Sequence, residues 1–208
     1  MKVWVYGNAA GKEAIGLPTQ TGDIEFIYPE AINPVPVRTG DAVIDLLFDH
    51  SAERIALLQN LGASLVVINC VVGTLEALPD HFARINGWPG FLERSSIEAA
   101  CKNDSIKEKV GLIFAAMGKK TEWVADIDGF ITARIVVAII NEAFHTFEEK
   151  VSTREDIDIA MKLGTNYPYG PFEWADKIGL KNIYALLVSL SREKSRYEPA
   201  ALLKEEAN

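Results

Sequence analysis

The sequence predicts an α/β N-terminal part with a short, mostly parallel sheet, followed by an all-α C-terminal part. The apolar runs 42–48 and 64–70 flank a segment of helical period, and this strand–helix–strand order implies parallel strands. From Gly129 onward, apolar residues recur at helical spacing to the end of the chain. We therefore expect two domains, over residues 1–126 and 127–208.

Several runs rich in apolar and β-branched residues are predicted to form the strands of the N-terminal part. In chain order they are Val3–Tyr6, Asp23–Tyr28, Ala42–Phe48, Ser64–Cys70, Phe82–Asn86 and Thr121–Ile127. The segments Ser51–Leu61, Val72–Leu78 and Asp104–Met117 are predicted to be helices. The proline-rich stretch 33–40 is expected to be extended.

The loop after the first strand is where a nucleotide-binding α/β protein carries its glycine fingerprint. The spacing of Gly7 and Gly11 fits neither G-x-G-x-x-G nor a P-loop, and Lys12 is followed by Glu13 instead of Ser or Thr. We therefore predict a turn into a short helix. A full crossover helix is not expected before Pro18, because a βαβ connection usually needs about a dozen residues or more.

A long helix is predicted over the apolar residues between 130 and 147. Their stripe is wide enough to be buried on more than one side of the helix. Because a lone surface helix needs only one apolar face, this stripe predicts a homodimer formed through the helical domain.

The remaining C-terminal signals mark helix ends. Ser152 and Glu155 form an S-x-x-E capping box, and Gly164 is expected to end the helix that this box opens. A last helix is predicted over Leu180–Leu190. The charged tail 193–208 is expected to be loosely held.

The bulk composition excludes several classes of function. The 208-residue chain has a net charge of −8, whereas a nucleic-acid partner requires a clustered basic face, so none is expected. No apolar run is long enough to span a bilayer and the N-terminus lacks a signal-peptide core, which predicts a cytoplasmic protein. Cys70 and Cys101 lack the spacing of a disulfide framework or a metal site.

The block from Asp126 to Asp176 carries many short motifs in a fixed order. Its characteristic residues are Asp126, Gly129-Phe130-Ile131, Arg134, Glu142-Ala143, Glu155-Asp156-Ile157-Asp158, Ala160-Met161-Lys162-Leu163-Gly164, Pro168, Gly170-Pro171-Phe172-Glu173 and Asp176, with Gly179-Leu180 after it. This block resembles the C-terminal domain of the 3-hydroxyacyl-CoA dehydrogenases, oxidoreductases of fatty-acid metabolism, and a weaker likeness extends upstream to about Asp41. The resemblance implies a Rossmann-like sheet domain that binds NAD, a helical dimerisation domain and an acyl-CoA substrate. Without the glycine fingerprint, the sheet domain is expected to be truncated.

The family's active-site residues are carried over position by position. Asn69 matches the asparagine of the family's N-T-S-S motif, but Val71 stands at its serine. Asn86 stands at the histidine of F-A-G-L-H, Glu98 at the glutamate that orients this histidine, and Ala133 at the asparagine of G-F-I-x-N-R. We therefore expect Glu98 as the remaining catalytic residue and Asn69 and Asn86 as substrate-binding residues, without a metal. Asparagine cannot accept a proton at neutral pH, so the resemblance implies a catalytically degenerate member.

Each of these residues also has a structural alternative. Asn69 can cap the turn after its strand, and Glu98 can lie on the solvated face of a short helical segment. The three histidines, His50, His81 and His145, are interpreted as solvated or interface side chains, because the sequence assigns them no carboxylate partner. Two functions stay open: an oxidoreductase of this family with altered chemistry, and a non-catalytic acyl-CoA-binding or dimeric scaffold protein without NAD.

Overall fold

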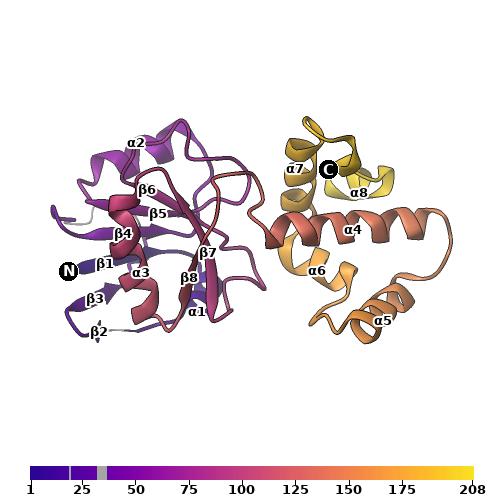
Figure 1. Ribbon diagram of the computed structural model, residues 1–208, viewed down its shortest axis with the longest axis horizontal. Coiled ribbons are helices and arrows are strands. Elements are labelled where there is room, and N and C mark those ends of the chain that lie inside the picture. Colours follow the sequence, from indigo (N-terminus) through magenta and orange to yellow (C-terminus); the bar gives the residue numbers. More distant parts are fainter. Residues whose placement is uncertain (19, 32–36) are drawn as a thin grey trace. The chain divides into compact units, whose positions relative to one another are not determined.

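The computed structural model describes residues 1–18, 20–31 and 37–208. The chain divides into two compact units, Met1–Ile127 and Asp128–Asn208 (Figure 1). Part of the proline-rich stretch, residues 33–36, lies outside the described residues. None of the helices in the described part of the chain is long and apolar enough to cross a membrane.

The first unit is built on one eight-stranded sheet in the order β2-β3-β1-β4-β5-β6-β7-β8. Its strands are β1 (Lys2–Tyr6), β2 (Gln20–Thr21), β3 (Ile24–Ile27), β4 (Ala42–Asp45), β5 (Leu65–Asn69), β6 (Phe82–Ile85), β7 (Ser96–Cys101) and β8 (Lys120–Trp123). The pairs from β3 through β1, β4 and β5 to β6 are parallel, and β8 is parallel to β7. Only the pairs β2–β3 and β6–β7 are antiparallel among the described residues. The predicted mostly parallel sheet is confirmed.

Helices cover both faces of this sheet. α1 (Ala9–Ile15) and α3 (Lys107–Ala116) contribute to a core on one face, in which Phe114 is fully buried. α2 (Ala52–Asn60) packs on the other face through the fully buried Leu58. The buried strands between the two helical layers explain the nearly continuous apolar runs of the sequence.

The connection from β1 to β3 confirms the predicted turn into a short helix. This helix is the seven-residue α1, capped by the Asn8 side chain, which accepts a hydrogen bond from the Gly11 N–H at 2.8 Å. The chain then forms the short antiparallel strand β2 before it enters β3. A short helix followed by a hairpin therefore replaces a full-length crossover helix.

Four segments of this unit differ from the prediction, one of them strand β8, which ends at Trp123 instead of Ile127. The expected helix at 72–78 is a series of bends and turns, in which the Leu75 N–H donates to Asp126 Oδ2 at 2.9 Å and Gly73 has a φ of 98°. The segment around Glu98 is strand β7 instead of a helix, because it pairs with β6. Strand β4 ends at Asp45, before the predicted end at Phe48. A ten-residue α3 follows a 3-10 turn, η1 (Asp104–Ile106).

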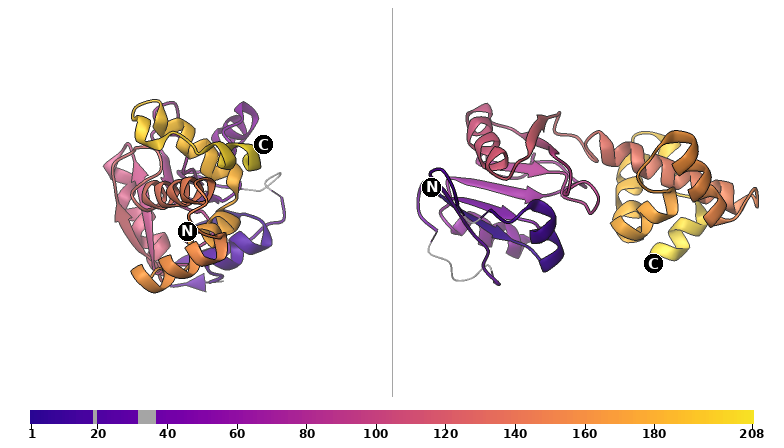
Figure 2. Two further views of the ribbon diagram at one scale, coloured as in Figure 1. Left: turned by 90° about the vertical axis from the view of Figure 1, so that its right-hand side faces the viewer. Right: turned by 90° about the horizontal axis from the view of Figure 1, so that it is seen from below.

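The second unit is entirely helical in the described part of the chain. Its elements are α4 (Thr132–Glu148), α5 (Arg154–Thr165), α6 (Pro171–Ile178), α7 (Leu180–Ser191), the 3-10 turn η2 (Ser195–Tyr197) and α8 (Ala201–Ala207). α4 contacts α6, α7 and α8, and the left view of Figure 2 looks along α4 with the other helices around it. The predicted all-α C-terminal part and its long helix are confirmed.

Caps in this unit fall one or two residues from their predicted positions. The side chain that caps α5 is Thr153, which accepts from the Asp156 N–H at 3.2 Å, instead of Ser152. α5 also continues through Gly164 and ends at Asn166, which has the left-handed φ of 57°. Both ends use a side chain type that suits the position equally well.

The tail after residue 193 is ordered, contrary to the expectation. The side-chain amide of the buried Asn141 donates to the Glu198 carbonyl and accepts from the Ala200 N–H, both at 2.9 Å. Leu203 of α8 is fully buried, and Tyr197 is nearly so. These contacts hold α8 on the helical unit.

The start of α6 explains much of the motif block. The nearly buried Asp158 accepts hydrogen bonds from the backbone N–H groups of Phe172 (2.8 Å) and Glu173 (3.1 Å), two of the donors that a helix leaves free at its N-terminus. The Glu173 carboxylate accepts from the Gly170 N–H at 2.9 Å and pairs with Lys162. A Cβ on Gly170 would lie 2.3 Å from Asp158 Cγ, so only glycine fits. These residues serve the scaffold.

Candidate functional site

The carboxyl ends of the parallel strands meet at one edge of the sheet, where open α/β proteins bind their ligands. The chain passes from β1 to β3 on one side and then to β4 on the other, so the switch in direction lies between β1 and β4. Asn8 follows β1, Leu46 follows β4, Asn69 ends β5 and Asn86 follows β6. This edge is therefore the first place to look for a site.

Asn69 connects the ends of three neighbouring strands. Its Oδ1 accepts from the Gly87 N–H at 3.0 Å, and its Nδ2 donates to the carbonyls of Gly87 (3.3 Å) and Leu46 (3.4 Å). A Cβ on Gly87 would lie 2.7 Å from Asn69 Cγ, so the close approach requires glycine. This turn-fixing role accounts for Asn69, and its role toward a substrate stays a prediction.

Asn86 and Glu98 lie in direct contact. Asn86 Nδ2 donates to Glu98 Oε2 at 3.0 Å, and the Asn86 N–H donates to the Glu98 carbonyl at 3.1 Å. Asn86 is almost fully buried, whereas Glu98 is half-buried. The two positions at which the resemblance expects a histidine and its orienting carboxylate are thus adjacent, with a carboxamide in place of the imidazole.

Arg84 is the charged residue that the sequence analysis missed. It lies on β6, its side chain is fully buried, and its guanidinium pairs with Asp126. It also donates to the carbonyls of Cys70 (3.0 Å) and Ile127 (2.7 Å). Arg84 therefore ties the turn after β5 to the segment after β8. An arginine inside the apolar run F-A-R-I is the signal that could have revealed it.

The turn after β5 buries the position of the expected serine. Val71 and Cys70 are both nearly inaccessible, and Cys70 Sγ lies 3.4 Å from Nε2 of the exposed His50. His81 packs its ring edge-to-face on Phe82, and burial lowers the pKa of His81. A valine at this turn can neither donate nor accept a hydrogen bond.

The two remaining predicted positions lie in the helical unit. Ala133, at the expected asparagine, is fully buried in α4. His145 lies farther along α4, with Nδ1 3.5 Å from Glu148 Oε2, so this histidine has a local carboxylate partner that the sequence analysis did not assign.

A buried polar cluster fills the opposite face of the sheet near the same edge. Asp45, fully buried at the end of β4, accepts from Arg54 Nε at 2.7 Å and from its Nη2 at 2.5 Å. Burial raises the pKa of the adjacent Tyr6 to about 12, although Arg54 opposes the shift. The Asp45 carboxylate is therefore bonded to Arg54 and is not a candidate site residue.

The residues of the β1–α1 loop do not fit a dinucleotide. In a dinucleotide fold, glycines let the backbone approach the pyrophosphate, whose charge the free N–H groups of the following helix bind. Here a Cβ on Gly7 would lie 3.0 Å from Leu46 Cδ1, and one on Gly11 would lie 3.4 Å from the same atom. The Gly11 N–H is already bonded to the Asn8 side chain. Leu46 and Asn8 thus lie against the two glycines and leave this loop unlike the open glycine loop that a pyrophosphate requires.

A small cavity remains at this edge. Its volume is about 180 Å³, and it is lined by residues of α1 and of the turns after β4, β5 and β6. Ligand pockets usually measure about 300–1,000 Å³, so this cavity is too small for a dinucleotide. Across residues 1–18, 20–31 and 37–208, no group of three or more His, Cys, Asp or Glu side chains is placed to hold a metal ion.

Comparison with known proteins identifies relatives of the helical unit and of about half of the chain. Residues 129–208 match the family described as 3-hydroxyacyl-CoA dehydrogenase, C-terminal domain. The chain is 39% identical over 111 residues to the 3-hydroxyadipyl-CoA dehydrogenase of Escherichia coli strain K12, an alignment that covers 52% of this chain and 23% of that protein. It is 38% identical over 109 residues to a 3-hydroxybutyryl-CoA dehydrogenase of Bradyrhizobium diazoefficiens, covering 51% of this chain and 37% of that protein.

The fold of the whole chain is also similar to that of solved structures. The (S)-3-hydroxybutyryl-CoA dehydrogenase of Ralstonia eutropha superposes with a TM-score of 0.70 at 25% identity, over 88% of this chain and 69% of that one. The alignments with the two curated relatives named above cover 23% and 37% of those proteins, which is well under half of their length. Residues 129–208 thus match the C-terminal domain of the 3-hydroxyacyl-CoA dehydrogenase family, and most of the chain is similar in fold to a dehydrogenase of this kind.

Proposed function

We propose that the chain is a catalytically degenerate member of this family, which does not carry out the NAD-linked oxidation of 3-hydroxyacyl-CoA. The observation that carries the proposal is the contact between Asn86 and Glu98. At this pair, a carboxylate supports a carboxamide instead of an imidazole.

The chemistry of the pair explains the loss. A histidine next to a carboxylate can accept a proton near neutral pH, because the carboxylate fixes its tautomer and stabilises the imidazolium. The Asn86 amide donates to Glu98 through Nδ2 and has no basic nitrogen. Loss of a general base lowers a rate by about 10²–10⁴-fold.

The β1–α1 loop supports the proposal independently. Leu46 packs on Gly7 and Gly11, and Asn8 binds the Gly11 N–H, unlike the open glycine loop that a pyrophosphate requires. A protein that lacks both the catalytic base and the loop that binds the cofactor's pyrophosphate is expected to have no residual dehydrogenase activity.

The assay mixes the purified chain with NADH and acetoacetyl-CoA and follows the loss of NADH absorbance. We expect the rate of a protein-free sample, and the same rate for the Asn86→Ala variant. A rate above this background that falls in Asn86→Ala would contradict the proposal, because it would assign turnover to this pair.

We also propose that the helical unit forms a homodimer. A groove of about 400 Å³ runs between α4 and α5, lined largely by Ile139, Ala143, Val151, Ile157, Ala160 and Met161. On the same helix α5, Leu163 is 83% exposed and Ile159 is 50% exposed. Contiguous exposed apolar surface of this kind marks protein interfaces.

Light scattering tests this second proposal. The chain is expected to have the mass of a dimer, and Leu163→Glu is expected to give a monomer. Leu112→Glu is the matched control, since Leu112 is 57% exposed but lies on α3 of the sheet unit. A monomeric parent chain, or equal effects of both substitutions, would contradict the proposed interface.

A further inference from the structure

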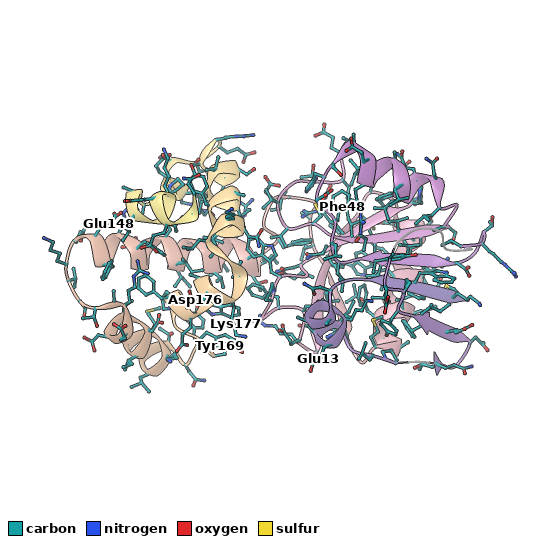
Figure 3. The ribbon with its side chains drawn as sticks, turned by 180° about the vertical axis from the view of Figure 1, so that it is seen from behind. Glu13, Phe48, Glu148, Tyr169, Asp176 and Lys177 are labelled. Carbon is teal, nitrogen blue, oxygen red and sulfur yellow. The ribbon has the colours of Figure 1, made fainter. Side chains whose placement is uncertain are left out.

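A cavity lies at the edge of the sheet unit where the parallel strands end. The proposed loss of dehydrogenase activity does not explain why this space is kept. It is bordered by α1, on which Figure 3 labels Glu13, and by the turn after β4. Most of its lining is apolar, including Ala10, Ala14, Leu46, Leu47, Pro89 and Leu92. A degenerate sheet domain could have filled this space completely, as protein cores generally do.

The size of the cavity limits what it can hold. Its volume is about 180 Å³, and it opens to solvent at Leu47 and Glu93, which are exposed. One aromatic ring with a short substituent fits this volume. A ring with a ribose and phosphates does not.

The polar groups of the lining limit the charge of a ligand. Glu93 is the only charged residue in the described lining, and Asn8 and Asn69 are the only side-chain amides. The Asn69 amide is bonded to the backbone at Gly87 and Leu46, so it adds little to recognition. Glu93 Oε2 accepts from the Gly90 N–H at 2.7 Å, which leaves the other oxygen for a ligand. The buried Lys119 interacts with the charge of Glu93, but it lies outside the lining and donates to the carbonyls of Leu92 and Arg94. The carboxylate in the lining therefore favours a cation over a phosphate.

We infer that this cavity binds a small aromatic amine, at the edge of the sheet where a dinucleotide would lie. The inference rests on the proposed function, because it requires that Leu46 stays packed on Gly7. The ring would pack between Leu47 and Leu92, and its ammonium group would face Glu93.

Three probes with the same ring and different charges test this inference: benzylamine, benzyl alcohol and phenyl phosphate. Each is titrated into the full chain, and backbone amide shifts of Leu46, Leu47 and Gly87 are followed by NMR. We expect benzylamine to bind with a Kd on the order of 1 mM, as suits a fragment of this size. Benzyl alcohol should bind roughly fivefold more weakly, the worth of one exposed ion pair. Phenyl phosphate should bind at least about tenfold more weakly.

Two variants test whether Glu93 causes the preference for benzylamine over benzyl alcohol. Glu93→Gln should make benzylamine and benzyl alcohol bind equally, whereas Glu53→Gln, on α2 at the other face of the sheet, should leave their order unchanged. Absence of shifts with all three probes overturns the inference and leaves the proposed function intact. Tighter binding of phenyl phosphate than of benzylamine also overturns it. NAD⁺ is added as a fourth probe, and binding of NAD⁺ more tightly than benzylamine would overturn the inference and the proposed function together.

Discussion

Replacement of Arg84 by methionine should destabilise the sheet unit strongly. Methionine keeps an unbranched side chain in the buried site but removes the guanidinium. The substitution deletes the ion pair with Asp126 and the hydrogen bonds to the carbonyls of Cys70 and Ile127. Asp126 would stay in place without its counter-ion.

The burial of the Arg84–Asp126 pair determines how much stability the substitution should remove. The Arg84 side chain is fully buried and that of Asp126 is 22% exposed. Removal of one partner of a buried ion pair costs about 3–5 kcal/mol. We expect the lower half of this range, because the Leu75 N–H still donates to Asp126. At about 2–4 °C per kcal/mol for a chain of this length, Tm should fall by roughly 6–16 °C.

Urea unfolding followed by tryptophan fluorescence measures the change. Arg84→Met, Asp126→Asn and the double variant form a cycle that isolates the interaction between the two side chains. Lys120→Met is the matched control, since its pair with Glu122 is exposed (78% and 48%) and should be worth less than about 1 kcal/mol. Equal effects of Arg84→Met and Lys120→Met, or a cycle with no coupling, would refute the reasoning.

Three further predictions concern Asn86, the buried phenols and the tail. In Asn86→His the new imidazole would lie beside Glu98, but NADH oxidation should stay at background because the β1–α1 loop does not fit the cofactor; a gain of about 10²-fold or more would show that the cofactor can bind. Burial raises the pKa of Tyr6 and of Tyr28 to about 12, so the stability that their neutral form contributes is complete below pH 10 and lost as the pH rises toward 12. Each Tyr→Phe change should remove one step near pH 12 from the ultraviolet titration, and ionisation of these phenols near pH 10 would contradict their burial. Asn141→Ala should cost about 1–3 kcal/mol and speed amide exchange in α8, whereas unchanged exchange would show that the tail is held by other contacts.

The sheet core could be predicted from sequence because its strands are buried on both faces. The strands β4 and β5 are apolar up to their last residues, Asp45 and Asn69, and this local pattern is visible without knowledge of the neighbouring strands. Strand β7 could not be found this way. Its sequence S-I-E-A-A-C contains helix formers, and only its pairing with β6 makes it a strand.

The C-terminal tail likewise could not be predicted from local sequence pattern. Its charge pattern indicates a solvated segment, but Asn141 lies some sixty positions earlier in the chain and binds it through Glu198 and Ala200. No local signal reports such a contact. Helix caps are off by one or two residues for a simpler reason, since neighbouring residues such as Ser152 and Thr153 can both cap a helix.

The candidate site was accessible from sequence in part. The resemblance identified Asn86 and Glu98 as a pair, and they lie 3.0 Å apart through the β6–β7 hairpin. Leu46 was not identified, because nothing in the sequence indicates that a leucine after β4 packs on the glycines after β1. Contacts between distant turns come from the sheet order, which local patterns do not specify.

Direct binding of NADH tests the central claim, which is that this chain has closed the cofactor seat of its family. The fluorescence of the nicotinamide ring is followed as the chain is titrated with NADH. We predict no saturable change up to about 1 mM, the upper end of usual KM values. Saturable binding in the micromolar range would contradict the account, because it would require Leu46 to leave the place where it packs on Gly7.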